Sequence, residues 1–441
     1  MTILAQTVRM VPLSVSKRTA GLIRDGQKEA AKVYMACRDA WKSAIVAGSD
    51  GPGRNELQAL VKGKFALHSQ SAQMVCHAFL GNVATTRKLR AQGRQEIRYP
   101  YRDKIFFPLM WPAQAMSIEG NRVILPMGRG RSSIVLRRPE WLTEPCACEL
   151  IWNRNHYELH LVITTEVAPE PPGENQATID LGQIHQCAVT TSTGKGLIVS
   201  GRGIRSEKRK LNKMHGTLAR RLSKCKKGSR RWKKLRRSRN RQALCAERKI
   251  ADMRHKGTRQ AIDFCQFNKV GRLYVGDPDG VRKRCCGRVH NQRMSQWEYG
   301  KDKDYLAHKS RQAGIASFNG SERGTSSHCP QCGHHHKPKG RQWVCTVCRF
   351  SGHRDLVGSA NMHPIAFGKK TTFPASNDVT YLRPGTSAKR VLDRSSRPGA
   401  GHGAPRRVAA RNLGSTTATV VSRAPQGAGH THVMLAEAHP L

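Results

Sequence analysis

The feature that most constrains the fold of this chain is a set of four cysteines in two closely spaced pairs. Cys329 and Cys332 form one Cys-x-x-Cys pair, and Cys345 and Cys348 form another after twelve intervening residues. Two such pairs can place four thiolates at the corners of a tetrahedron, the coordination that structural Zn²⁺ prefers. The spacing therefore predicts a small zinc ribbon at residues 328–351 that serves folding rather than catalysis. Four free thiols or a redox pair are the alternative interpretation.

The remaining cysteine content supports reduced thiols or metal ligands. The 441 residues include 14 cysteines, a density well below that of disulfide-stabilised scaffolds. The N-terminal residues lack the basic segment and long apolar run of a signal peptide, so we expect a cytoplasmic protein. No apolar run approaches the roughly 18 residues of a membrane-spanning helix, and we expect no membrane partner. His334, His335 and His336 could offer alternative zinc ligands, but we expect them in a solvated loop.

The charge of the chain predicts a polyanionic partner. Seventy-seven Lys and Arg residues against 30 Asp and Glu residues give a formal net charge of +47, and nucleic acid is the commonest compensating polyanion. The excess is concentrated in a helical segment, residues 205–259, with 23 basic and three acidic residues. Like charges at helical spacing destabilise a helix unless a phosphate backbone relieves them. We therefore expect nucleic-acid contacts rather than a merely solvated face at Lys224, Lys226, Lys227, Arg230, Arg231, Trp232, Lys233, Lys234, Arg236 and Arg237.

Hydrophobic patterning divides the chain into β-rich and helical segments. Residues 1–24 read as one or two strands, with Pro12 indicating an edge strand or a bulge. Residues 25–116 are mainly helical, and 116–167 return to strands with a hairpin turn at 152–155. A Pro-rich stretch, 168–175, is a candidate domain boundary. Strands follow near 176–200, 271–277 and 314–322, a helix begins near 353, and residues 368–441 have the composition of a disordered basic tail.

Four acidic residues are candidates for a catalytic site. Asp180 lies within the apolar run Ala-Thr-Ile-Asp-Leu-Gly, where a carboxylate is costly unless it is paired or bound to a metal; an Asp that caps a turn at the strand end is the alternative. Asp355 lies at the start of the helix after the cysteines, where it can simply favour the helix dipole. Asp277 ends the strand Leu-Tyr-Val-Gly-Asp, and Glu322 ends the strand Ala-Ser-Phe-Asn-Gly-Ser-Glu. Either could complete a two-metal phosphodiester site.

The order of these motifs resembles that of the TnpB nucleases of insertion sequences and the compact type V CRISPR effectors. The motifs are Thr-Ile-Asp-Leu-Gly, the basic helical hairpin, Tyr-Val-Gly-Asp, the paired cysteines and the segment His-Arg-Asp-Leu-Val-Gly-Ser-Ala-Asn. The resemblance is strongest over residues 175–366. It implies a multi-domain α/β protein: a wedge β-barrel (1–24 and 117–172), a helical recognition lobe (25–116), an RNase-H-like RuvC domain (173–327 and 352–367), the zinc ribbon and the tail.

The resemblance also implies site residues. Asp180 matches the first catalytic carboxylate of the family and Asp355 matches the third. Asp277 stands where the family usually has its second, a Glu, and is followed by Pro278. Some members carry that Glu just before the Thr-Ser of the zinc module, where Glu322 stands here. We therefore predict that Asp180, Glu322 and Asp355 hold two Mg²⁺ ions, with Asp277 as the competing second carboxylate.

The function implied by the resemblance is RNA-guided, Mg²⁺-dependent cleavage of DNA. The expected partners are a guide RNA and target double-stranded DNA with a short flanking motif, bound by a monomer or a homodimer. One alternative is a nuclease-inactive RNA-guided protein that represses by binding. Another is an unguided zinc-ribbon protein of the transposase kind, which would act on DNA ends without RNA.

Overall fold

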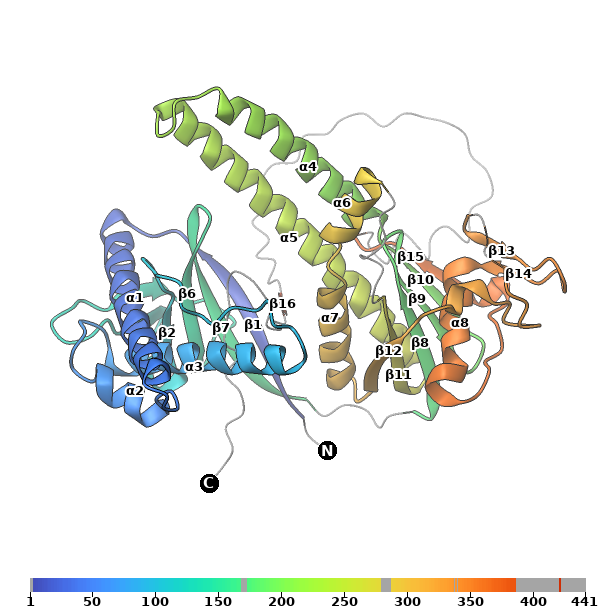
Figure 1. Cartoon of the computed structure of the whole chain (residues 1–441), viewed down its shortest axis with the longest axis horizontal. Helices are drawn as coiled ribbons and strands as arrows, with labels where there is room; N and C mark the ends of the chain where they lie inside the picture. Colours follow the sequence, from blue (N-terminus) through green and yellow to red (C-terminus); the bar gives the residue numbers. More distant parts are fainter. Residues whose placement is uncertain are drawn as a thin grey trace. The chain divides into compact units, whose positions relative to one another are not determined.

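The computed structural model describes residues 3–167, 173–278, 287–336, 338, 340–385 and 420–421. The chain divides into two compact units (Figure 1). Gln6–Thr165 and residues 418–441 form the N-terminal unit, and residues 1–5 with Glu166–Thr417 form the C-terminal unit. No helix in the described part of the chain is long and apolar enough to span a membrane.

The N-terminal unit combines three helices with short strands. Its elements are β1 (Ile3–Leu13), α1 (Lys17–Val46), α2 (Arg54–Val61), α3 (Ser69–Ala91), β2 (Leu109–Trp111), β3 (Ser117–Glu119), β4 (Arg122–Leu125), β5 (Ile134–Arg137), β6 (Ala147–Asn153), β7 (His156–Val167) and β16 (Val420–Val421). Helix α1 begins earlier than the predicted boundary at residue 25, because the Ser16 hydroxyl accepts a hydrogen bond from the Thr19 amide and caps it. Rings of Tyr34 (α1), Phe79 (α3) and Phe107 pack together in the core.

The strands of this unit form two sheets. One has the order β16-β1-β7-β6-β2, and the other has the order β3-β4-β5. The predicted hairpin at 152–155 is present: β6 and β7 pair from Asn153 and His156 outward, and Arg154 turns with a positive φ of 59°. β1 is a single strand, and its pairing with β16 involves Val8 and Arg9. The pairings of the described residues do not close a ring, so the predicted barrel is not confirmed.

The C-terminal unit is built on one six-stranded sheet of order β12-β11-β8-β9-β10-β15. Its elements are β8 (Asn175–Leu181), β9 (His185–Thr191), β10 (Gly196–Ser200), α4 (Arg202–Ser223), α5 (Arg230–Phe267), β11 (Val270–Asp277), α6 (Arg288–Gln296), α7 (Tyr299–Gln312), β12 (Ala316–Ser321), β13 (Gln342–Val344), β14 (Ser351–His353), α8 (Arg354–Phe367) and β15 (Val379–Leu382). β8, β9 and β10 are antiparallel, whereas β11 runs parallel to both β8 and β12. This is the RNase-H-like topology, and the α/β fold class predicted from the sequence is confirmed.

Both faces of the sheet are covered, which explains its hydrophobic sequence. Every residue of β9 is buried, because α8 packs on one face of β8 and β9 and α5 packs on the other side of β9 and β10. The basic segment forms the predicted helical hairpin: α4 and α5 run antiparallel and their tip extends beyond the sheet (Figure 1). Helices α6 and α7, between β11 and β12, were not predicted from the sequence.

The predicted disordered tail begins too early. Residues 379–382 form β15, which runs parallel to β10 at the edge of the sheet, from Gly196 opposite Val379 to Val199 opposite Leu382. Phe373 packs against the ring of Phe350 in the zinc module. A few apolar residues in a polar segment are enough to order it once a sheet edge offers backbone partners. Residues 386–419 and 422–441 of the predicted tail lie outside the described residues.

Candidate metal centre and nucleic-acid interface

Asp180 lies near the carboxyl end of β8, in the middle of the sheet. β9 and β11 flank β8, and Asp180 stands opposite Ala188 of β9. Burial raises the pKa of Asp180 well above its usual value, and the negative charges of Glu322 and Asp355 raise it further. The fold therefore brings Glu322, at the end of β12, and Asp355, at the start of α8, within electrostatic reach of Asp180 on β8.

Small residues let α8 approach Asp180 closely. A Cβ atom added at Gly358 would lie 2.7 Å from Oδ2 of Asp180, so a larger residue there would have to displace the carboxylate. The Ser359 hydroxyl donates to the Thr178 carbonyl at 2.8 Å, and the Thr178 hydroxyl donates to the Ser359 carbonyl at 2.7 Å. The Thr190 and Ser359 hydroxyls also bond to each other at 2.8 Å. These buried bonds fix the helix on β8 and β9.

Asp355, in the first turn of α8, is held by two basic side chains. His185 Nδ1 lies 2.7 Å from Oδ2 of Asp355, and Arg341 donates to Oδ1 at 2.9 Å. Burial alone would raise the pKa of Asp355, but the His185 hydrogen bond and the Arg341 charge outweigh it and lower that pKa. His353 caps the same helix by accepting a hydrogen bond from the Asp355 amide at 3.2 Å. Asp355 is therefore an oriented carboxylate rather than only a favourable charge at a helix end.

The two competing second carboxylates differ in their partners. Asp277, at the end of β11, forms an ion pair with Lys303 of 2.5 Å. Oε2 of Glu322, one residue after β12, is buried and has no hydrogen-bond partner in the described part of the chain. Burial and the nearby Asp277 charge raise the pKa of Glu322 to about 7. Glu322 is thus the acid that carries a free oxygen and that acts electrostatically on Asp180.

The carboxylates fit a hard divalent cation. All donors are oxygens, which Mg²⁺ prefers, and a cation would relieve both the orphaned oxygen of Glu322 and the repulsion on Asp180. The three carboxylates are spread apart rather than tightly clustered. In the described residues, two groups have ligand atoms that all lie within 4.8 Å of one another: the four cysteines, and His185 with His353 and Asp355. Asp180 and Glu322 belong to neither group. Two ions about 3.5–4 Å apart, rather than one, suit such an open set.

A basic cavity opens beside Asp180 and Asp355. Its volume is about 420 Å³, and its basic lining consists of Arg205, Arg293, Arg341, Arg354, His185 and His290. A second cavity of about 680 Å³ shares Arg205 and Arg293 with the first and adds further basic residues of α4: Arg202, Lys208, Arg209 and Lys213. The two cavities are therefore lined by positive charges that could bind a phosphate backbone beside Asp180 and Asp355.

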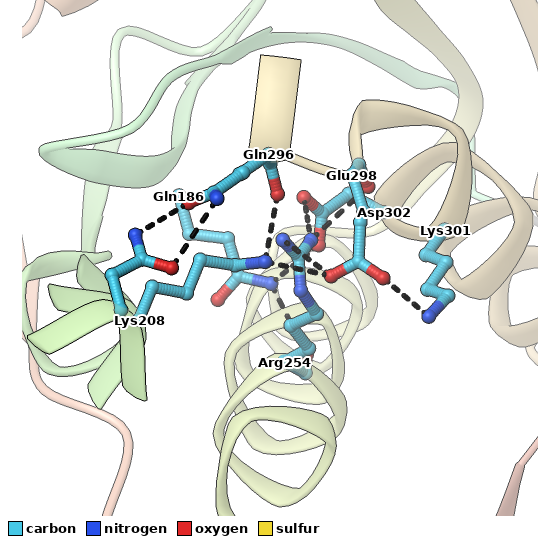
Figure 2. Close-up of polar contacts among 8 residues, drawn as sticks. Gln186, Lys208, Arg254, Gln296, Glu298, Lys301 and Asp302 are labelled. Atoms are coloured by element: carbon cyan, nitrogen blue, oxygen red, sulfur yellow. Dashed lines mark hydrogen bonds and ion pairs between the residues drawn. The ribbon is translucent and has the colours of Figure 1, made fainter. Parts of the chain in front are cut away.

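A buried polar network supports the strand that carries His185 (Figure 2). The neighbouring Gln186 donates to Asp302 at 2.9 Å and to the Arg254 carbonyl at 3.2 Å. Arg254 forms an ion pair with Asp302, and both side chains are 1% exposed. Lys208 of α4 donates to Glu298 at 3.0 Å, and Arg254 donates to the Glu298 carbonyl at 3.2 Å. The network therefore joins α4, α5, α7 and β9 behind the metal centre.

The four cysteines of the predicted ribbon lie together. The Cys329–Cys348 and Cys332–Cys345 sulfur pairs are each 3.6 Å apart, close to the roughly 3.8 Å edge of a tetrahedron with Zn–S bonds of about 2.3 Å. Burial raises the pKa of the Cys345 thiol, but the amides of Cys348 and Val347 outweigh it and lower that pKa to about 6. The cluster fits a zinc site. His334 contacts Thr346 instead of the sulfurs.

The predicted nucleic-acid residues surround the tip of the α4–α5 hairpin. Gly228, with a φ of 86°, makes the turn, and the Ser229 hydroxyl caps α5 by accepting from the Trp232 amide. Trp232 is half-buried, and the guanidinium of Arg236 lies 5.1 Å from its ring centre. The other predicted contact residues are exposed: Lys224, Lys226, Lys227, Arg230, Arg231, Lys233, Lys234, Arg236 and Arg237. The tip is an accessible cationic surface.

Sequence reasoning missed the residues that orient the acids. His185, Arg341 and Lys303 come from three separate elements, and no local pattern marks them as partners of Asp355 and Asp277. A histidine at the start of the strand after Asp180 was a usable signal, because consecutive antiparallel strands lie side by side.

Comparisons with known proteins agree with these observations. Residues 160–282 match the family model OrfB_IS605, a probable transposase, and residues 299–362 match the Cas12f1-like TNB domain. A chain in the cryo-EM structure of a Cas12f1–sgRNA–target DNA complex is 14% identical, with a TM-score of 0.57 over 79% of this chain and 83% of that chain, which shows a shared fold. CasPhi-2 (Cas12j) bound to crRNA and phosphorothioate-DNA is 10% identical, with a TM-score of 0.42 over 85% and 92%. The curated proteins include no match to this chain.

Proposed function

We propose that this chain, whose resemblance to TnpB proteins and compact type V effectors is confirmed over residues 160–282 and 299–362, is an RNA-guided DNA endonuclease. The observation that carries the proposal is the convergence of Asp180, Glu322 and Asp355 at one edge of an RNase-H-like sheet, with a free oxygen on Glu322. The partners would be a guide RNA and a double-stranded DNA target, as in the Cas12f1 complex of the same fold.

In this proposal Asp180, Glu322 and Asp355 hold two Mg²⁺ ions. When bound, the ions would activate a water and stabilise the leaving 3′-oxygen of a phosphodiester. The chain's own residues orient the acids: Gly358 leaves room for Asp180, and His185 fixes the rotation of Asp355. Arg205 and Arg293 would hold the phosphates of the substrate strand in the basic cavity. Asp277 is left out of the proposed set because its carboxylate is already paired with Lys303.

We also propose a division of labour among the domains. Residues 173–327 and 352–367 form the nuclease domain, to which the structure adds β15, and residues 328–351 form a zinc ribbon inserted before α8. The strands of 1–24 and 117–172 and the helices of 25–116, with α1 beginning at Lys17, would clamp the guide–target duplex through its backbone. The α4–α5 tip would bind a phosphate backbone, with Trp232 available for stacking.

The first test is to sequence the RNA that copurifies when the protein is expressed with its own flanking DNA. One dominant RNA with a constant part and a short variable end supports guiding and identifies the target. A broad mixture of cellular RNAs would overturn guiding and favour the unguided transposase-like alternative.

The second test measures cleavage of that target in Mg²⁺ by isosteric variants. Because each loses a metal ligand, Asp180→Asn and Glu322→Gln are expected to lower the rate by at least about 100-fold, or roughly 2.7 kcal/mol in activation free energy. Asp277→Asn, the matched control, should stay within about threefold of the wild type. An inactive Asp277→Asn with an active Glu322→Gln would reverse the assignment. A wild type that binds the target without cutting would establish the binding-only alternative, for which the Arg341 cation on Asp355 is the favouring observation.

A further inference from the structure

Three potential metal-ligating side chains, one of them Asp355, lie together at the start of α8. His185 begins β9, His353 precedes α8 and Asp355 lies in its first turn, and one ligand atom from each lies within 4.8 Å of the other two. The two imidazole rings pack edge to face, with ring centres 4.8 Å apart and an interplanar angle of 66°. This set shares Asp355 with the carboxylates described above but contributes nitrogen instead of oxygen.

The two histidines are held in place before any ligand binds. His185 is 6% exposed, and its neighbour Gln186 is fixed by the buried Asp302–Arg254 network (Figure 2). His353 accepts the hydrogen bond that caps α8, and its ring packs edge to face with the ring of Tyr381 on β15. Ordered ligands lower the entropic cost of binding, as expected for a built site.

The contacts within the set are those that one cation can replace. His185 Nδ1 and Asp355 Oδ2 are 2.7 Å apart, and ligand atoms about 2.1 Å from one octahedral ion are roughly 3 Å apart. Arg341 now supplies the positive charge on Asp355, but its side chain is 43% exposed and can withdraw into solvent. An incoming divalent cation would take the place of this guanidinium beside Asp355.

Ligand chemistry decides which cation fits. Imidazole nitrogen binds Mn²⁺, Fe²⁺, Co²⁺ or Zn²⁺ far better than Mg²⁺, which prefers oxygen. Two histidines and one carboxylate with open positions form a typical site for such transition ions. We propose that His185, His353 and Asp355 bind one divalent transition-metal ion, at a position beside the three carboxylates that shares only Asp355 with them and prefers Mn²⁺-like ions to Mg²⁺. The proposal builds on the proposed function, since Asp355 is common to both.

The test uses the full chain with its ribbon zinc retained and Mn²⁺ as the probe. Citrate dialysis removes weakly held ions, and metal analysis confirms about one zinc per chain. Mn²⁺ binding is measured by electron paramagnetic resonance, and electron spin-echo modulation reports imidazole nitrogen bound to the ion. The variant is His185→Asn/His353→Asn, because Asn at position 353 keeps an N-cap for α8. The matched control is His290→Gln, a histidine of the same cavity outside the set.

The wild type and His290→Gln are expected to show imidazole modulation, and the double variant should lose it together with about 10–100-fold in Mn²⁺ affinity. Circular dichroism and an unchanged zinc content show that the double variant is folded. Mn²⁺ bound without nitrogen modulation, or equal modulation in the double variant, would overturn the inference. Cleavage without imidazole coordination would leave the nuclease proposal standing and refute this one. Imidazole coordination without cleavage would support the metal site and refute the nuclease proposal.

Discussion

The two halves of helix α5 accommodate basic residues in opposite ways. Near its start Arg230, Arg231 and Lys233 are exposed, and residues 224–241 contain no acidic residue. In its second half Arg254 is 1% exposed and is bound by Asp302 and Glu298. One helix thus carries an uncompensated charge at the hairpin tip and a compensated charge where it is buried.

The difference teaches that charge indicates function only where the fold leaves it unpaired. A buried guanidinium without partners would cost several kcal/mol, so Arg254 needs its carboxylates for the protein to fold. The exposed lysines at the tip are destabilised only by their mutual repulsion, which a phosphate backbone relieves. The tip is therefore available for binding, whereas Arg254 holds α5, α7 and β9 together.

Removal of Arg254 is expected to have the largest effect, on the free energy of unfolding. Arg254→Ala leaves Asp302 buried without its ion-pair partner, and we expect a loss of about 3–5 kcal/mol in the free energy of unfolding. Urea unfolding followed by tryptophan fluorescence measures it. The matched control is Arg236→Ala at the exposed tip, which should change stability by less than about 0.5 kcal/mol. Equal effects of the two substitutions would mean that the buried network contributes no more than a surface charge.

Neutralisation of the tip should have the next largest effect, on binding rather than on stability. We expect Lys226→Gln/Lys227→Gln/Arg230→Gln/Arg231→Gln to reduce the slope of log affinity against log salt by about 2.8–3.6, because each phosphate contact contributes roughly 0.7–0.9. Fluorescence anisotropy with a short RNA or DNA duplex at several salt concentrations measures the slope.

Four substitutions to Gln at exposed basic residues of the C-terminal unit, outside the hairpin tip and the two basic cavities, provide a charge-matched control: Lys256, Arg311, Lys369 and Lys370. Both variants should unfold at the wild-type temperature. A control slope equal to that of the tip variant would show that total charge, and not the position of the tip, sets the affinity.

Much of the C-terminal fold is predictable from local patterns. The apolar runs that become β8, β9, β10 and β11, and the helical rhythm of the basic hairpin, depend on neighbouring residues alone. Helices α6 and α7 have polar, weakly periodic sequences, so no local signal indicates them. β15 is a four-residue strand that is stable only because β10 offers it an edge, and sequence reasoning therefore placed it in a disordered tail.

The acids of the proposed centre carry signals in the sequence, but their partners do not. Asp180 and Asp355 occupy motifs, and Glu322 follows a recognisable strand. His185 and Arg341 contact Asp355, and Lys303 contacts Asp277, through tertiary contacts between residues 14 to 170 positions apart. The Lys303 contact is the reason that we propose Glu322 rather than Asp277, a choice that residue type and spacing leave open.

Lys309 of α7 offers a further comparison with a smaller effect, because it is a buried lysine that forms no ion pair with a carboxylate of the described residues. It is 5% exposed, and it donates to the His255 carbonyl at 2.6 Å and to Thr258 at 2.5 Å. Burial, aided by the Arg259 charge, lowers the pKa of Lys309 to about 7. An unfolded lysine keeps its proton up to about pH 10.4, so between these two values the unfolded state binds more protons and stability rises with pH.

We therefore expect the wild type to gain stability relative to Lys309→Met as the pH rises from 7 to 9, by about 1 kcal/mol per pH unit. Urea unfolding of both proteins at pH 7, 8 and 9 gives this difference, and the subtraction removes groups that titrate equally in both. Lys256→Met, at the exposed ion pair with Asp252, is the control and should show no such rise. Parallel curves for the wild type and Lys309→Met would mean that its two oxygen partners keep Lys309 charged. The buried part of α5 around His255 and Thr258 would then tolerate a charged lysine without a carboxylate partner, as the exposed tip does.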